Sequence, residues 1–135
     1  MSSKRKLSKA DYVARARFRH QLRLFERFTQ EACDQQEITL TQYLLLLQVK
    51  GRPDRDWALV RELSDCLVLR HNTTVELVSR CEAAQLVRRE QDPDDLRKVR
   101  VMLTPRGGRI VEKIARHHLE EFERLLAHMR TVLEG

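Results

Sequence analysis

The chain has 135 residues, enough for one domain or for one domain with added dimerising helices. Hydrophobic residues make up 41% of it and charged residues 34%, so its helices must be mostly amphipathic, and four glycines and three prolines are too few for a turn-rich β-sandwich or a disordered linker. The apolar runs Leu44–Leu47 and Leu67–Leu69 are far shorter than the roughly 20 residues of a membrane span. Because no apolar stretch follows the basic N-terminus, no secretory signal is expected. The composition predicts a soluble, cytoplasmic protein without a membrane partner.

The formal net charge of +6 raises the expectation of a polyanionic partner such as DNA. The excess lies near the N-terminus, where residues 1–23 hold eight basic side chains and one acidic side chain, whereas residues 58–100 hold eight of each. The basic run fits a solubilising tail and nonspecific phosphate contacts equally well. Nucleic-acid binding must therefore be argued from the placement of particular residues.

Three cysteines, Cys33, Cys66 and Cys81, are an odd number without CxxC spacing, which argues against a disulfide framework or a zinc knuckle and fits a reducing compartment. Cys66 and Cys81 lie on apolar stripes and are expected in the core, while Cys33 stands beside acidic residues. The adjacent His117 and His118 point different ways on a helix, so no metal site is predicted. The sequence has no phosphate-binding loop, nucleophile elbow or HExxH motif, and it predicts no enzyme, no catalytic residue and no cofactor.

The N-terminal part of the chain, residues 1–38, predicts a basic segment followed by one long amphipathic helix. From Asp11 to about Gln35 there is no glycine or proline, and apolar residues recur every three or four positions with arginines on the other side of the helix. We interpret this helix as the first dimerisation helix.

Residues 39–104 predict a winged helix-turn-helix domain. Its helices are expected at about 41–50, 58–67 and 72–84, with a polar turn at 51–56. The two short helices at 58–67 and 72–84, separated by a few residues, are typical of a helix-turn-helix.

Two pairs have the spacing of a capping box, in which side chain and backbone of residues three apart satisfy each other at a helix start. Thr39 with Gln42 predicts the start of the first of these helices. Thr73 with Glu76 predicts the start of the last, where Asn72 is an alternative cap.

A hairpin is predicted at about residues 86–103. Val99, Val101 and Leu103 alternate with polar or flexible residues, residues 86–91 supply a partner strand, and the polar sequence DPDDLR forms an exposed tip. A hairpin placed directly after a helix-turn-helix is a wing.

Residues 105–135 predict the C-terminal dimerisation helices. Thr104 and Pro105 have the arrangement of a helix start. The apolar stripe that follows is too long for a small domain to cover and comprises Ile110, Ile114, Leu119, Phe122, Leu126, Met129 and Leu133. The predicted fold class is mainly α (α+β), a winged helix-turn-helix whose N- and C-terminal helices form a dimerisation domain.

Over residues 39–108 this pattern resembles the MarR (multiple antibiotic resistance regulator) family of winged-helix regulators. The most specific residues belong to the wing and its exit: Asp92, Pro93, Asp95, Arg97, Val101, Leu103, Thr104 and Gly107. Two positions depart from the family pattern. Gln85 stands where the family usually ends its recognition helix with glycine, which predicts a differently shaped or strained helix end. Leu96 stands where many relatives have a second arginine, which leaves Arg97 as the one arginine at the wing tip.

The resemblance implies a dimeric, sequence-specific DNA-binding transcriptional regulator, a repressor that occludes a promoter by binding a pseudo-palindromic operator. In such proteins the N-terminal end of the recognition helix enters the major groove, and an arginine of the wing fits the narrow minor groove. The predicted DNA-binding residues are Arg70, His71, Asn72, Thr73, Thr74, Leu77, Arg80, Asp95 and Arg97. Among them, Arg80 suits either a phosphate contact or an ion pair.

Arg70 can pair with guanine and Asn72 with adenine, while threonine methyl groups can contact thymine methyl groups. Asp95 is expected to hold Arg97 in place. Asn72 and Thr73 can instead be helix caps alone, and Arg97 can be a solvated loop charge.

The resemblance also implies a small effector, often aromatic and anionic, that binds between the dimerisation helices and the winged domain and releases the DNA. Candidate ligand-binding residues are Arg15, Arg19, His20, Arg23 and Tyr43, although arginines on a first helix also fit a plain solvated face. Two other functions stay open: a winged-helix protein-interaction module without specific DNA binding, and a thiol-based redox-sensing regulator.

Overall fold

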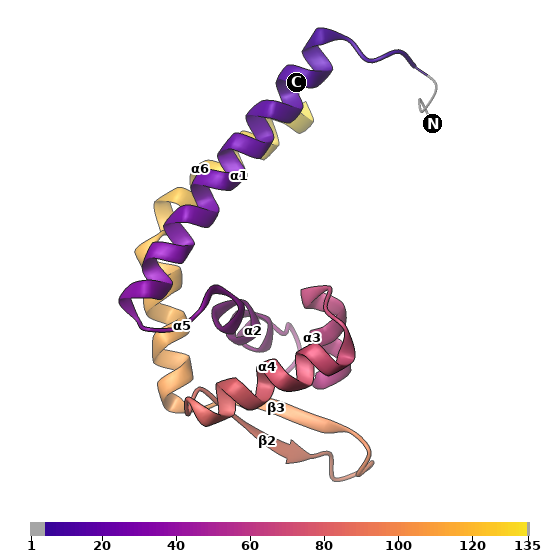
Figure 1. Ribbon diagram of the computed structural model, residues 1–135, viewed down its shortest axis with the longest axis vertical. Helices are drawn as coiled ribbons and strands as arrows, with labels where there is room; N and C mark the ends of the chain where they lie inside the picture. Colours follow the sequence, from indigo (N-terminus) through magenta and orange to yellow (C-terminus); the bar gives the residue numbers. More distant parts are fainter. Residues whose placement is uncertain (1–4, 135) are drawn as a thin grey trace.

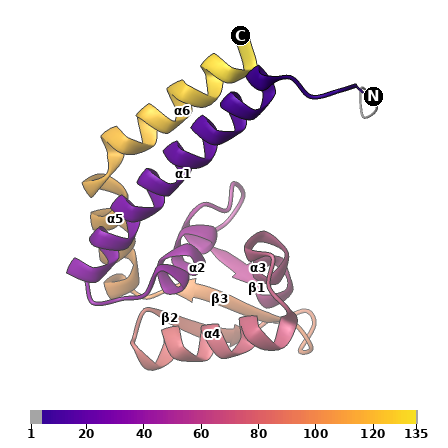
Figure 2. The same ribbon diagram turned by 45° about the horizontal axis from the view of Figure 1, so that its top comes forward.

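The computed structural model describes residues 5–134, so residues 1–4, with the first lysine of the basic run, and Gly135 lie outside the description. Over residues 5–134 the chain forms, in order, α1 (Lys9–Gln35), α2 (Leu40–Lys50), β1 (Trp57–Leu59), α3 (Val60–Leu67), α4 (His71–Ala83), β2 (Val87–Gln91), β3 (Val99–Leu103), α5 (Pro105–His117) and α6 (Leu119–Glu134). Figures 1 and 2 show α1 and α6 side by side as a long antiparallel arm, joined by α5 to a body made of the other elements. This arrangement confirms the predicted winged helix-turn-helix fold, mainly helical. No helix within residues 5–134 combines the length and the apolarity that crossing a bilayer requires.

The body is built around α2. The predicted capping box is confirmed: the Gln42 N–H donates to the Thr39 hydroxyl (3.1 Å), and the Thr39 N–H donates to the Gln42 side chain (2.9 Å). The apolar residues behind this cap occupy almost every side of the helix, and several of them are buried in the core: Tyr43, Leu45, Leu46 and Val49. The helix is not buried all round, however, because Leu44 (36%) and Leu47 (37%) remain exposed in the single chain.

The three strands form one antiparallel sheet in the order β1-β3-β2. β2 and β3 are the two sides of the predicted wing hairpin, and Val101 pairs with Arg89 on one side and with Ala58 on the other. The predicted helix at 58–67 was wrong at its start, because residues 57–59 are extended and pair with β3. A strand of three residues is too short to show a period in sequence, so the pairing depends on a partner more than 40 residues away.

The recognition helix α4 also begins earlier than predicted, at His71, with Arg70 as the extended N-cap. Neither Asn72 nor Thr73 caps it, since both lie inside the first turn, and Glu76 lies on the exposed side of the helix. The first intrahelical hydrogen bond agrees with this start: the Thr74 N–H donates to the Arg70 carbonyl, and so does the Thr74 hydroxyl (3.0 Å each). The capping interpretation of Asn72 and Thr73 is therefore incorrect.

Helix α4 ends at a strained residue. Gln85 has a left-handed backbone (φ 61°) although it has a side chain. Its N–H donates to the Glu82 carbonyl, and the Leu86 N–H donates to the Cys81 carbonyl, as in a Schellman motif. Of the two predicted outcomes, a reshaped helix end or a strained one, the structure has the strained one.

The predicted C-terminal stripe divides between body and arm. Ile110 and Ile114 are buried in the core of the body. The arm residues Leu119, Phe122, Leu126 and Met129 remain exposed in the single chain, and the side chain of Leu133 is outside the description.

Candidate nucleic-acid interface

The first turn of α4 presents a row of exposed polar side chains. Arg70, His71, Asn72 and Thr73 are all exposed. Further along the same helix, Arg80 is exposed and lies 3.9 Å from the Glu76 carboxylate. Polar groups at the N-terminal end of a helix-turn-helix recognition helix are the ones that reach base edges in the major groove.

Two of the predicted DNA-binding residues lie on the opposite side of this helix. Thr74 is 0% exposed and Leu77 is 5% exposed. Leu77 belongs to the hydrophobic core, and the Thr74 hydroxyl is used by the backbone of its own helix. Neither side chain can contact a base, because the helix turns by about 100° per residue and the exposed and buried faces are fixed by the core.

The wing tip is ordered by its own carboxylates. Asp92 accepts hydrogen bonds from the backbone N–H groups of Asp94 (2.9 Å) and Asp95 (3.1 Å), which fold the tip into a tight turn. Asp95 accepts from Nε of Arg97 (3.1 Å) and from its backbone N–H (3.1 Å). This hydrogen bonding by Arg97 holds the pKa of Asp95 below its ordinary value. The side chain of Arg97 is 91% exposed, although two of its guanidinium nitrogens, Nε and Nη2, donate to the two carboxylate oxygens of Asp95.

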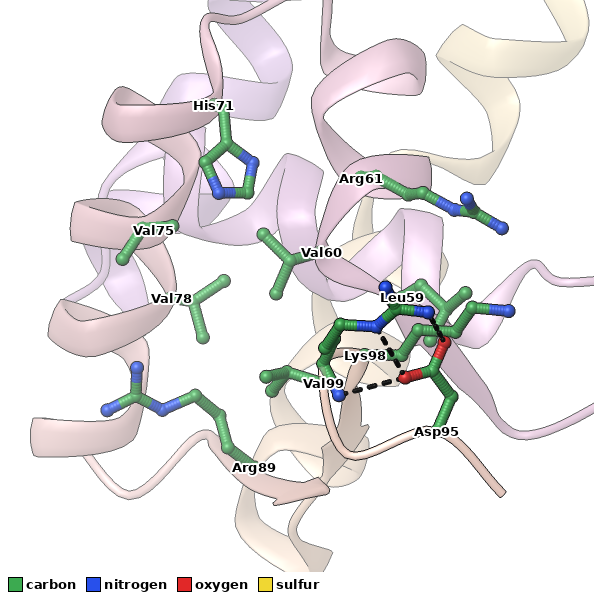
Figure 3. A pocket seen from close by; sticks show the side chains of 11 residues that line it. Leu59, Val60, Arg61, His71, Val75, Val78, Arg89, Asp95, Lys98 and Val99 are labelled. Carbon is green, nitrogen blue, oxygen red and sulfur yellow. Dashed lines mark hydrogen bonds and ion pairs between the residues drawn. The ribbon is translucent and has the colours of Figure 1, made fainter. Parts of the chain in front are cut away.

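A groove of about 570 Å³ separates the recognition helix from the wing (Figure 3). Its floor is apolar, with Val75 and Val78 of α4 facing Val60 and Val99. Its rim carries mostly cationic side chains together with one carboxylate: Arg61, His71, Arg89, Arg97, Lys98 and Asp95. The groove thus joins the two regions expected to contact DNA into one basic surface.

Three residues of this rim, Arg61, Arg89 and Lys98, were missed by the sequence analysis. The signal was weak, because the central region is neutral overall and Arg89 belongs to a strand whose side chains alternate between faces. Arg89 is also paired with Glu82 (2.9 Å), which reduces its charge toward the groove.

The candidate ligand-binding residues do not share one surface in the part of the chain that the structure describes. Arg15, Arg19, His20 and Arg23 are exposed along α1. Tyr43 is buried in the body, with its ring centroid 6.3 Å from that of His118. A site that contains all five is therefore not formed within this chain.

The cysteines divide differently from the prediction. Cys81 is buried as expected, and so is Cys33, and burial raises the pKa of each thiol to about 11. Cys66 was expected in the core and is exposed, 3.9 Å from a guanidinium nitrogen of Arg52. The buried side of α3 consists of Val60, Leu63 and Ser64, and this spacing leaves Cys66 toward solvent. Within residues 5–134, no three His, Cys, Asp or Glu side chains lie close enough together to hold a metal ion.

Known proteins share this sequence pattern and this fold. Residues 36–98 match the model of the MarR family. YsmB, an uncharacterized HTH-type transcriptional regulator of Bacillus subtilis (strain 168), is 32% identical over 96 residues, which are 71% of this chain and 64% of that protein, so the chain spans less than two thirds of this curated relative.

Two solved structures share the fold. AbsC, a MarR family transcriptional regulator from Streptomyces coelicolor, has a TM-score of 0.76 at 22% identity, with 93% of this chain and 84% of that chain covered. A mutant MarR from E. coli complexed with operator DNA has a TM-score of 0.70 at 20% identity, with 86% and 87% covered.

Proposed function

We propose that the chain is a member of the MarR family through its winged-helix domain, and that it is a dimeric, sequence-specific DNA-binding repressor of transcription in the cytoplasm and not an enzyme. The observation that carries the proposal is the joint exposure of the first turn of α4 and of Arg97 on either side of one basic groove. Of the described relatives of similar fold, one is complexed with operator DNA. The buried Thr74 and Leu77 are excluded from the proposed contacts.

In this proposal α4 enters the major groove with Arg70, Asn72 and Thr73 toward the bases. Arg97 enters the adjacent minor groove, where the negative potential is strongest if the groove is narrow. Arg80 is proposed to contact a DNA phosphate. Its ion pair with the exposed Glu76 is weak enough for a phosphate to replace the carboxylate, as is usual for ion pairs between exposed side chains.

The arm is proposed to pack against the arm of a second copy of this chain. Both helices of the arm leave large apolar side chains exposed in the single chain: Leu24 and Phe28 on α1, and Leu119, Phe122, Leu126 and Met129 on α6. Pairing of two arms would bury them and would place two recognition helices on one face of the DNA. Half-sites one helical turn apart, roughly 34–36 Å, would then be read as an inverted repeat.

Release by a small effector completes the proposal. Arg15, Arg19, His20 and Arg23 are exposed on the arm, where a second copy can add the remaining wall of an anion-binding cleft. Tyr43 is left out of this cleft because it is buried in the body.

The decisive experiment is the selection of binding sites from random duplex DNA by the purified protein at about 150 mM salt, at which nonspecific attraction to phosphates is suppressed. We expect an inverted repeat with half-sites about one helical turn apart. Recovery of no motif, with binding that vanishes as salt rises, would contradict the proposal and favour the protein-interaction module.

A further inference from the structure

Trp57, the single tryptophan of the chain, lies between two guanidinium groups. The guanidinium carbon of Arg55 is 4.3 Å from the centroid of the Trp57 ring system, and that of Arg100 is 4.0 Å away. Both distances are within the range of a cation–π interaction, in which indole is the strongest aromatic partner. Two elements far apart in sequence, the turn before β1 and the strand β3, are thereby joined through one side chain.

On the side of the helix-turn-helix, Arg55 is held by the N-terminal turn of α3. Both terminal nitrogens of Arg55 donate to the two carboxylate oxygens of Glu62 (2.8 and 2.7 Å). Glu62 also accepts from Arg52 (2.9 Å) and from the backbone N–H of Leu59 (2.8 Å), the residue before α3. The Arg55 hydrogen bonds hold the pKa of Glu62 below its ordinary value, so the pair is ionised at neutral pH.

On the side of the wing, Arg100 is held by the residue that shapes the tip. Nε of Arg100 donates to Asp92 (3.0 Å), whose other oxygen accepts from the backbone of Asp94 and Asp95. Asp95 in turn holds Arg97. A continuous series of contacts therefore runs from α3 through Trp57 to the arginine at the wing tip.

The strand register shows why the wing needs such a support. β1 pairs with β3 only from Arg100 to Met102, while the hairpin continues beyond it with Val99 opposite Gln91. Past Arg100, no third strand from residues 5–134 pairs with the hairpin to fix its angle, and a two-stranded ribbon twists easily. Trp57 pairs with Met102, so Arg100 is its diagonal neighbour on the same face of the sheet, at the point where the wing leaves the body.

We propose that Trp57 is a positioning residue for the wing: clamped between the Arg55–Glu62 and Arg100–Asp92 pairs, it sets the angle at which Arg97 meets the DNA. The inference rests on the proposed DNA-binding function. It assigns no DNA contact to Trp57 itself and predicts that the effect of this residue on DNA affinity passes through Arg97.

A double-mutant cycle with Arg97→Ala tests this, with affinity measured on the selected operator at fixed salt. In the wild-type background, Trp57→Leu is expected to weaken operator binding about fivefold, and Trp57→Phe, which keeps an aromatic face, to weaken it less. In the Arg97→Ala background, Trp57→Leu is expected to change affinity by less than about twofold, because the contact that it positions is already gone. Equal losses in the two backgrounds would overturn the inference and leave Trp57 a merely structural residue.

A second variant keeps the test independent of the folding of Trp57→Leu. Arg100→Lys retains the charge and the tryptophan but loses the planar group, so it is expected to show the same coupling to Arg97 and to change the fluorescence of Trp57 in the free protein. Arg109→Lys, an exposed arginine of α5, is the matched control and should change neither. Unchanged fluorescence in Arg100→Lys would overturn the stacking. A wild-type protein that selects no DNA site would overturn the proposed function itself, whatever the variants do.

Discussion

The Thr104 hydroxyl donates a 2.6 Å hydrogen bond to the carbonyl of Gln85, which ties the start of α5 to the end of the recognition helix. The same hydroxyl accepts from the Gly107 N–H (3.0 Å) and so caps α5. The start of α5 is thus hydrogen-bonded to Gln85, a residue with a left-handed backbone at the end of α4.

Gln85→Gly is expected to raise the free energy of unfolding by about 1 kcal/mol, because glycine adopts the left-handed conformation without the clash of a Cβ. The measurement is the midpoint of denaturant unfolding at an unchanged slope. Ala83→Gly is the control: because residue 83 is helical, this substitution is expected to lower the free energy of unfolding by about 0.5–1 kcal/mol. A loss of stability in Gln85→Gly would contradict the assignment of strain to this residue.

The adjacent glycines of α5 provide a matched pair. A Cβ on Gly107 would collide with the backbone carbonyl of Leu86, whereas a Cβ on Gly108 would meet no atom within 4 Å. Gly107→Ala is therefore expected to destabilise the protein by about 1–3 kcal/mol. Gly108→Ala is expected to be neutral or to stabilise it by up to about 1 kcal/mol, as alanine does in a helix. The measurement is the melting temperature of the two variants in parallel thermal unfolding. Similar melting temperatures would contradict the close approach of Gly107 to the Leu86 carbonyl.

The roles of the DNA-facing residues are separable by salt and sequence. Arg97→Ala is expected to weaken binding to all sequences and to lower the slope of log affinity against log salt by about 1, as loss of one phosphate-region charge does. Asn72→Ala is expected to relax the preference at one base pair with little change in the slope. Thr74→Val should leave the base preference unchanged, because the Thr74 side chain is buried. Titration of selected and single-base variant operators at several salt concentrations measures both quantities. A change of base preference in Thr74→Val would contradict the assignment of Thr74 to the buried face of α4.

The wing turn is expected to respond to acid through Asp92. The backbone N–H of Asp94, followed by Arg100 and Asp95, holds the pKa of Asp92 below its ordinary value of 3.8. A lowered folded-state pKa means that the ionised carboxylate stabilises the fold above about pH 4 and that this contribution is lost as the pH falls through the lowered pKa. Asp92→Asn is expected to be less stable than the wild type at pH 7, with a difference that shrinks below pH 4. A difference in unfolding free energy that stays constant from pH 7 to pH 2 would contradict this assignment.

Iodoacetamide is expected to label Cys66 in the folded protein and to spare Cys33 and Cys81 until the chain unfolds. Cys66 is exposed, while the other two thiols are buried with pKa values raised to about 11. Mass spectrometry of a time course with and without denaturant shows the order, and Cys66→Ser should abolish the early label. Early labelling of Cys33 would mean that the end of α1 opens. The redox-sensing alternative therefore depends on Cys66.

Patterns within a few residues were enough to predict most of the elements. The capping pair Thr39–Gln42 and the alternation from Val99 to Leu103 are local, and both were confirmed because their hydrogen bonds or side-chain faces are set by neighbours in sequence. The pair Thr73–Glu76 has the same spacing, but the capping box predicted from it was wrong. There the N-cap is Arg70, three residues before Thr73, and the Arg70 carbonyl accepts from the Thr74 N–H.

The sequence by itself determined the order of the helices and of the wing hairpin, the winged-helix class and the polar first turn of the recognition helix, since these depend on period, caps and turn residues. Only the tertiary structure decided that Thr74 and Leu77 turn inward, that Cys66 turns outward, that residues 57–59 form a strand and that Trp57 lies between Arg55 and Arg100. Each of these depends on the side of an element that faces the core or on a partner far along the chain. Helical and strand periods define which residues share a face, but packing against distant residues selects the face that is buried.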